Sequence, residues 1–127
     1  MFTRIVECTV KPDKRDELLQ RLRNEILPLL QKQPGFMDEI GLVSEHDPER
    51  MVAISFWKTR EDAERYHRDN FPRVQDIVKP YLKGSMKVET YNVEESTIHR
   101  IAAGKAAYHC LRIAVRGGAL CFWEMRL

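Results

Sequence analysis

Residues 1–93 switch between two hydrophobic periods, one typical of strands and one typical of helices. Alternating side chains predict strands at residues 2–10, 36–44 and 85–93, and a short, nearly continuous apolar run predicts another at residues 51–57. Apolar residues recur every three or four positions elsewhere, which predicts helices at residues 13–31, 60–70 and 72–84. Pro72 separates the last two helices, because proline fits the first turn of a helix and disfavours helical geometry in the residue before it.

The order of these elements is β-α-β-β-α-β. It is the pattern of an α+β, ferredoxin-like fold, in which a four-stranded antiparallel sheet carries its helices on one face. We therefore expect one domain over residues 1–93. In the second strand, strict alternation would place Phe36 on the same face as Asp38 and Ile40, opposite Glu39 and Gly41.

Two residues predict local irregularities. Pro28 lies near the end of the first helix, and it should kink that helix because it lacks a backbone N–H. Gly41 lies inside the second strand, where a glycine often marks a bulge or a close approach.

The strand over residues 51–57 has apolar side chains on both faces. Val52, Ile54 and Phe56 alternate with Met51, Ala53, Ser55 and Trp57. Helices on one side of the sheet can cover only one of these faces. The other face is expected to pair with a second subunit, which predicts a homodimer.

The helix over residues 60–70 has an unusual inward face. Thr59 is a good N-cap for it, with Asp62 in a capping-box position. A face that begins at Ala63 continues with Tyr66, His67 and Asn70, where a packed helix normally carries aliphatic residues. One interpretation is a pocket with polar groups in its wall. The other is that Tyr66 buries its ring and His67 lies at the edge, in water.

Composition excludes several classes of protein. Hydrophobic residues make up 43% and charged residues 31% of the chain, as in an ordinary globular protein. The net charge of +2, with acidic residues spread among the basic ones, argues against nucleic-acid binding. No apolar run is long enough to span a membrane, and the N-terminal residues form a strand pattern and show no signal peptide.

The cysteines and histidines show no ligand spacing. Three widely separated cysteines fit neither a complete disulfide set nor a zinc site, and reduced thiols in the cytoplasm are the simplest explanation. His46 lies in a polar loop, and His99 and His109 lie near the C-terminal end without partners at metal-binding spacing. We therefore expect neither a metal nor a cofactor.

Residues 94–127 are a C-terminal extension that the β-α-β-β-α-β core does not require. Residues 108–115 and 119–125 have strand character, and Gly117-Gly118 between them is typical of a hairpin turn. One alternative is a disordered extension. The other, which we favour because the segment is rich in apolar residues, is an arm or β-hairpin packed across a dimer.

Three segments resemble the antibiotic biosynthesis monooxygenase (ABM) superfamily of dimeric α/β-barrel domains. They are IVECTVKPDKRDEL in the first strand and helix entry, LQKQPGF before the second strand, and MVAISFWKTREDAERYHRDNF. The resemblance covers about residues 2–93. It implies a dimer whose two sheets pack face to face and a pocket between sheet and helices. The implied activities are metal- and flavin-free oxygenation of aromatics or quinols, and breakdown of haem.

Residue-by-residue comparison disfavours haem breakdown. The haem-degrading branch has an asparagine on its first strand, a tryptophan on its second helix and an iron-binding histidine beyond it. Here the first strand has no asparagine, Tyr66 lies near the tryptophan position, and Val74 and Gln75 occupy the histidine region. The quinol-oxidising branch tends to have a histidine near the position of Phe71, and that histidine is also absent here. His67 lies four residues earlier and could project from the same face, but it is not a residue match.

The sequence thus predicts a cofactor-independent monooxygenase for a small aromatic or quinol-type compound. In this hypothesis Tyr66 and His67 are catalytic, since a histidine with a pKa near neutrality suits deprotonation of a phenol. The expected substrate-binding residues are Phe56, Trp57, Asn70 and Phe71. The alternative is a non-catalytic dimeric module of the same fold, for small-molecule binding or for assembly.

Overall fold

A computed structural model of the chain describes residues 1–101, 107–115 and 118–126. The chain divides into two compact units, Met1–Asn92 and Val93–Leu127. Each unit is described by itself.

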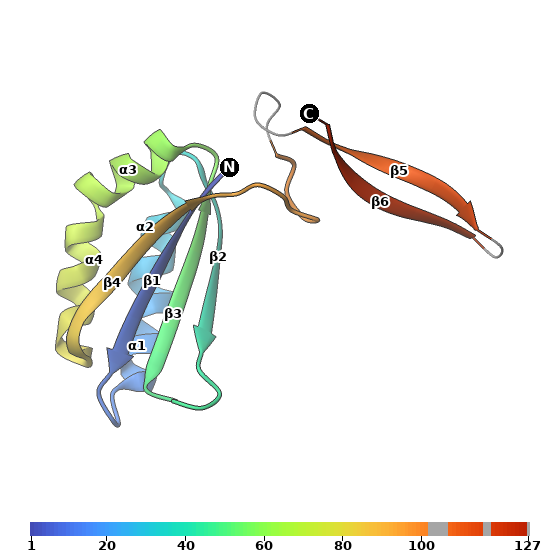
Figure 1. Cartoon of the computed structure of the whole chain (residues 1–127). Coiled ribbons are helices and arrows are strands. Elements are labelled where there is room, and N and C mark those ends of the chain that lie inside the picture. The colour runs from blue at the N-terminus through green and yellow to red at the C-terminus, as the bar shows by residue number, and fades with distance from the viewer. Residues whose placement is uncertain (102–106, 116–117, 127) are drawn as a thin grey trace. The chain divides into compact units, whose positions relative to one another are not determined.

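The first unit contains a four-stranded antiparallel sheet with strand order β2-β3-β1-β4. Its strands are β1 (Phe2–Val10), β2 (Phe36–Val43), β3 (Arg50–Trp57) and β4 (Leu82–Asn92). The helices lie on one side of this sheet (Figure 1). The predicted α+β, ferredoxin-like fold is therefore confirmed.

The helical segments are shorter than the patterns predicted. They are α1 (Arg15–Arg21), the π-helical turn η1 (Leu22–Ile26), α2 (Leu27–Gln31), α3 (Arg60–Asp69), α4 (Phe71–Val78) and the 3₁₀ turn η2 (Lys79–Tyr81). Between β1 and β2 the chain widens into a π-helical turn just before Pro28, where we predicted a kink. The Leu27 N–H reaches back five residues to the Leu22 carbonyl. Proline has no backbone N–H to donate to the preceding turn, and a π-helical turn accommodates the missing hydrogen bond.

The entry to α3 has the expected cap. The Thr59 hydroxyl accepts a hydrogen bond from the Asp62 N–H at 3.1 Å and donates one to the Asp62 carboxylate at 2.9 Å. The same carboxylate packs against Gly35, which has φ of +78° in the turn before β2. This contact joins the start of α3 to the start of β2.

Strand register shows which face of the sheet is covered. Phe2 is paired with Trp57, and Arg4 with Ser55, so these residues of β1 and β3 share the face that packs against the helices. The core on this side contains Val10, Leu18, Ile26, Leu30, Trp57, Ala63, Tyr66, Phe71, Val74, Val78 and Leu82. Ile5, Ile54 and Ile40 lie opposite one another on the other face, across β1, β3 and β2. We call this second side the open face.

A β-bulge interrupts the alternation in β2. Phe36 pairs with Trp57 and Asp38 pairs with Phe56, so one extra residue, Met37, lies between two adjacent pairs. Phe36 consequently shares the helix-covered face with Glu39, and the strict alternation that placed it with Asp38 is wrong at this point.

The second unit contains a two-stranded antiparallel hairpin. Its strands are β5 (Ala107–Val115) and β6 (Gly118–Arg126), with Val115 paired to Gly118 (Figure 1). Gly117 of the predicted turn lies outside the described residues.

Candidate functional site

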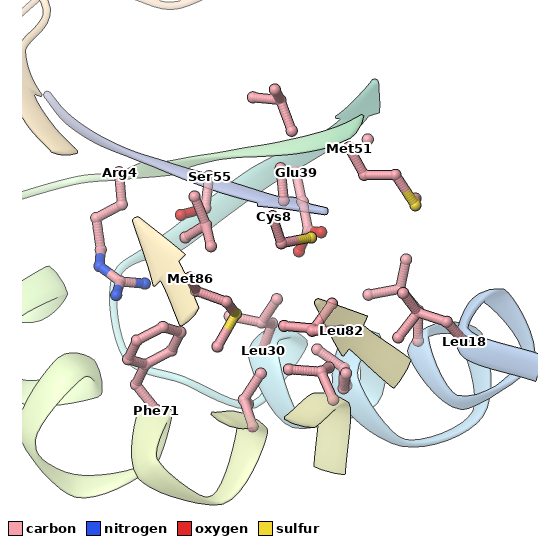
Figure 2. Close-up of a pocket in the computed structure, with 18 of the residues that line it drawn as sticks. Arg4, Cys8, Leu18, Leu30, Glu39, Met51, Ser55, Phe71, Leu82 and Met86 are labelled. Carbon is pink, nitrogen blue, oxygen red and sulfur yellow. The ribbon is translucent and has the colours of Figure 1, made fainter. Parts of the chain in front are cut away.

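A cavity of about 110 Å³ lies between the helix-covered face of the sheet and the helices (Figure 2). Most of its wall is apolar, with side chains from β1, α1, η1, α2, α4 and β4. Its polar wall residues in the described part of the chain are Arg4, Cys8, Glu39, Ser55 and Tyr66.

Small residues on the sheet make room for this cavity. Gly41 pairs with Ala53, which pairs with Val6, so two small positions adjoin in the middle of the covered face. Nothing lies within 4 Å of where a Cβ of Gly41 would stand. The role of Gly41 is thus to leave open space, and the bulge in this strand lies elsewhere, between Phe36 and Asp38.

Three polar residues form one row across the covered face. Glu39 on β2 pairs with Ser55 on β3, and Ser55 pairs with Arg4 on β1. We call Glu39, Ser55 and Arg4 the polar row. Adjacent strands lie roughly 4.8 Å apart, so the backbones of Glu39 and Arg4 are separated by about 10 Å.

Arg4 is held in place mainly by aromatic rings. Its side chain is only 3% exposed, and its guanidinium carbon lies 4.5 Å from the ring centre of Phe71 and 5.0 Å from that of Tyr66. Burial lowers the pKa of Arg4, although an arginine side chain remains charged in a protein. Arg4 therefore contributes a fixed positive charge to one end of the cavity.

His67 lies on the solvent side of this arginine. Its ring stacks on Phe71, and its Nδ1 lies 2.9 Å from the Arg4 Nη2. A guanidinium can only donate, so Nδ1 must be the acceptor and any ring proton of the neutral form is on Nε2. Partial burial and the positive charge of Arg4 lower the pKa of His67. His67 is exposed and is absent from the cavity wall, in contrast to Tyr66.

Tyr66 lies in the cavity wall, and its exposed fraction is 3%. Its ring stacks on Trp57 with a centroid distance of 5.0 Å. Burial, the main cause, raises the pKa of Tyr66 to about 12, although the charge of Arg4 works against this effect. Its hydroxyl is consequently protonated at neutral pH, where it can donate a hydrogen bond but cannot act as a base.

Glu39 differs from Arg4, the other charged residue among the described residues of the cavity wall, because its carboxylate is not fully paired. Its Oε2 atom is buried and has no hydrogen-bond partner among the described residues. Burial raises the pKa of Glu39 from 4.5 to about 7. Figure 2 shows the carboxylate on the cavity side of the sheet. A buried group that titrates near neutrality in a cavity is a candidate for proton transfer.

Neither Trp57 nor Phe56, the two strand residues expected to form the pocket wall, lines the cavity. Trp57 is completely buried on the covered face, where its indole N–H donates to the Ser55 hydroxyl at 3.0 Å. Phe56 pairs with Thr3 and Asp38 on the open face. Our expectation that Phe56 lines the pocket is therefore corrected, because successive strand residues point to opposite faces.

The two remaining predicted site residues lie at the junction of α3 and α4. Phe71 is buried and lines the cavity. Asn70 donates through its side-chain amide to the Gln33 side chain at 2.9 Å and does not belong to the cavity wall. Phe71 and Tyr66 are thus brought together in the cavity, whereas Asn70 and His67 lie outside it.

The sequence profile described as antibiotic biosynthesis monooxygenase (ABM) matches residues 1–79. The chain belongs to the ABM family. No curated protein matches the chain.

Solved structures share the fold of this ABM domain. A Nitrosomonas europaea protein named for the same family is 26% identical, with a TM-score of 0.63 over 73% of this chain and 89% of its own. A conserved protein from Methanosarcina mazei is 20% identical, with a TM-score of 0.61 over 72% and 91% of the two chains. A Deinococcus radiodurans protein, also named for the family, is 13% identical, with a TM-score of 0.64 over 81% and 100%. The last two identities support the fold alone.

Sequence reasoning missed two charged residues of this ABM domain, Arg4 and Glu39. Arg4 lies between Phe2 and Val6, two residues with inward side chains, so a charge at this position was a detectable signal. Glu39 was hidden by the bulge, which changes the face of every residue after it.

The described residues contain neither a metal-binding cluster of side chains nor a helix that could span a membrane. Nowhere in that part of the ABM chain do three or more histidine, cysteine, aspartate or glutamate side chains gather in a way that could hold a metal ion. Among the helices described, none has the length and apolar character needed to cross a membrane.

Proposed function

We propose that this ABM domain is a cofactor-independent monooxygenase that acts on a single-ring phenol or quinol bound in the cavity. The observation that carries the proposal is the cavity itself, an apolar space with a buried arginine and a buried tyrosine hydroxyl at one end. Ligand sites of proteins have this composition, with a mostly apolar wall and a few polar groups that fix orientation.

The size of the cavity favours one aromatic ring. Its volume of about 110 Å³ is of the order of an engineered apolar cavity of about 150 Å³ that binds benzene. A polycyclic substrate would require the helices to move away from the sheet. We therefore assign a monocyclic compound to this site.

The chemistry requires an electron-rich substrate. Loss of the hydroxyl proton gives a phenolate, which can pass an electron to dioxygen without a metal or flavin. For a quinol the balanced reaction consumes one dioxygen, inserts one oxygen atom at a ring C–H and releases the other as water. The quinol is oxidised to a hydroxyquinone, and dioxygen is the oxidant.

Tyr66 and His67 have different roles in this proposal. Tyr66 lines the cavity and is protonated, so it orients the substrate oxygen by donating a hydrogen bond. His67 accepts a hydrogen bond from Arg4 and acts through it, as a positioning residue. Phe71 supports both, because Arg4 and His67 each contact its ring.

We also propose that the domain is a homodimer that pairs through the open face, as the family resemblance implies. Ile40 and Leu42 are 47% and 45% exposed there. Apolar side chains gathered on one face of a sheet are typical of an interface between subunits.

A second function, a non-catalytic binding module, is favoured by the position of His67. The residue first expected to act as the base lies outside the cavity wall. A binding module would keep the cavity and its affinity for small aromatics but would show no oxygen uptake.

The test combines binding and oxygen uptake for a panel of single-ring quinols and phenols, with Gly41→Ala and Gly41→Val as graded variants. A side chain at position 41 would enter the cavity. We expect binding and turnover to fall slightly in the alanine variant and at least tenfold in the valine variant, with melting temperatures unchanged or higher. A valine variant with unchanged binding would show that the cavity is not the site.

A further inference from the structure

The carboxylate of Glu39, whose Oε2 atom has no hydrogen-bond partner among the described residues, has no part in the roles given above. Burying a carboxylate without a partner is costly, and buried polar groups in proteins are nearly always hydrogen-bonded. Here Oε2 is buried and lacks a hydrogen-bond partner in the described part of the chain. Such a group is expected where a ligand supplies the missing hydrogen bond.

Arg4 does not neutralise this carboxylate. The two residues lie at opposite ends of the polar row, with Ser55 between them. The raised pKa of Glu39 has burial as its cause, with no contribution from a nearby positive charge. A cation and an anionic group thus line one cavity while remaining apart, which leaves room for a polar atom of a ligand between them.

The other groups that face Glu39 cannot take its role. From β1, the half-buried Cys8 thiol has a pKa raised by burial and stays protonated. From α3, Tyr66 is also protonated, and the charge of Glu39 is one reason for its high pKa. Ser55 on β3 carries no charge. The remaining elements line the cavity with apolar residues, namely Leu18, Leu22, Ile26, Leu30, Phe71, Val74, Val78, Leu82 and Met86.

We infer that Glu39 accepts the proton of the substrate hydroxyl and that Arg4 holds the resulting oxyanion at the other end of the polar row. This inference rests on the proposed function. The substrate O–H bond breaks, its electron pair stays on the substrate oxygen, and the proton forms an O–H bond with Oε2 of Glu39. The guanidinium of Arg4 then faces the negative charge that has formed on the substrate oxygen. The proton stays within the cavity, so the net charge of the site does not change.

The experiment compares Glu39→Gln with Glu7→Gln, the same substitution at a residue of β1 that pairs with Arg50 outside the cavity. Two readouts are used: absorbance of a bound nitrophenol, whose anion and neutral form absorb at different wavelengths, and the pH profile of oxygen uptake with single-ring quinols. Glu39→Asp is the third variant, because it retains a carboxylate. Circular dichroism checks that each variant folds.

We expect wild type and Glu7→Gln to bind the nitrophenol as its anion, and their turnover to rise with pH through about 7 as Glu39 loses its proton. Glu39→Gln should lose about 10²–10⁴-fold in turnover and lose the step in the pH profile. It should still bind the nitrophenol anion beside Arg4, because glutamine is neutral like the protonated glutamate. Glu39→Asp should restore part of both signals.

Two results would contradict the inference in different ways. If Glu39→Gln keeps both its turnover and the pH step, Glu39 is not the proton acceptor, while the proposed function stands. If wild type neither binds the nitrophenol nor oxidises any quinol, the proposed function fails, and the role of Glu39 fails with it.

Discussion

At the scale of single residues, Glu39 should make stability depend on pH. Its pKa is raised from 4.5 to about 7 in the folded protein. Between these pH values the folded state holds a proton that the unfolded chain releases, so the free energy of unfolding must fall as the pH rises. At about 1.4 kcal/mol per pH unit, the loss is at most about 3 kcal/mol and is complete above pH 7.

Urea denaturation at pH 5 and pH 8 measures this loss. Wild type should be less stable at pH 8 than at pH 5, after subtraction of the change seen in Glu39→Gln, which lacks the titrating group. Equal pH dependence in the two proteins would show that the Glu39 carboxyl is solvated or paired in solution.

The position of His67 leads to a second prediction at this scale. His67→Ala removes the acceptor of a hydrogen bond from Arg4, but it removes no group from the cavity wall. We expect turnover to fall less than tenfold, with the pH step near 7 retained and the melting temperature almost unchanged. A loss of 10²–10⁴-fold, which is the contribution of a positioned base, would instead support the role first given to His67 from the sequence.

Tyr66 could be placed on the inward face of its helix from sequence because helical spacing is regular. Its neighbour His67 is one residue from Tyr66, about 100° around the helix, and this step takes it from the wall of the cavity to solvent. Helical spacing alone could not decide whether His67 lies in the cavity wall or in solvent, because a residue at the edge of the inward face can occupy either position. Arg4 was detectable as a charge between inward apolar residues, but nothing in the sequence showed which aromatic rings would surround it.

At the scale of elements, Gly35 joins two of them. Its φ of +78° disfavours any side chain, and a Cβ would collide with the Asp62 carboxylate, which accepts a hydrogen bond from the Thr59 hydroxyl that caps α3. Gly84 has a similar φ of +74° but has nothing within 4 Å of its Cβ position. Gly84→Ala should therefore cost only the left-handed strain of about 1–2 kcal/mol, and Gly35→Ala should cost more, because it also displaces the cap.

Thermal or urea unfolding of the two alanine variants measures the difference. We expect Gly35→Ala to be less stable than Gly84→Ala by about 1 kcal/mol or more, the usual contribution of a helix cap. If the two variants lose equal stability, the contact between Gly35 and Asp62 contributes nothing beyond backbone strain.

The elements themselves could be predicted because each period continues for several residues. Local irregularities could not, since a bulge adds one residue and leaves the composition of the strand unchanged. In β2 either face could be apolar after the bulge, because Ile40 and Leu42 alternate with Gly41 and Val43. The same limit applies to the π-helical turn, where Pro28 indicated a disturbance but not its form.

At the scale of the whole molecule, the open face leads to the final prediction. Ile5, Ile54 and Ile40 form a row across three strands of this face, and Ile54 is central because β3 lies between β1 and β2. If two copies pair through this face, Ile54→Glu would bury a charge without a partner, which costs several kcal/mol. His46→Glu places the same charge in an exposed loop and should leave assembly unchanged.

Light scattering coupled to size-exclusion chromatography measures the mass of each protein at micromolar concentration. We expect a dimer for wild type and His46→Glu, and a folded monomer for Ile54→Glu. The cavity lies on the covered face, so a monomeric Ile54→Glu variant that still binds a single-ring phenol would show that each subunit contains a complete site. A monomeric wild type would contradict the dimer, and the apolar open face would then require another explanation.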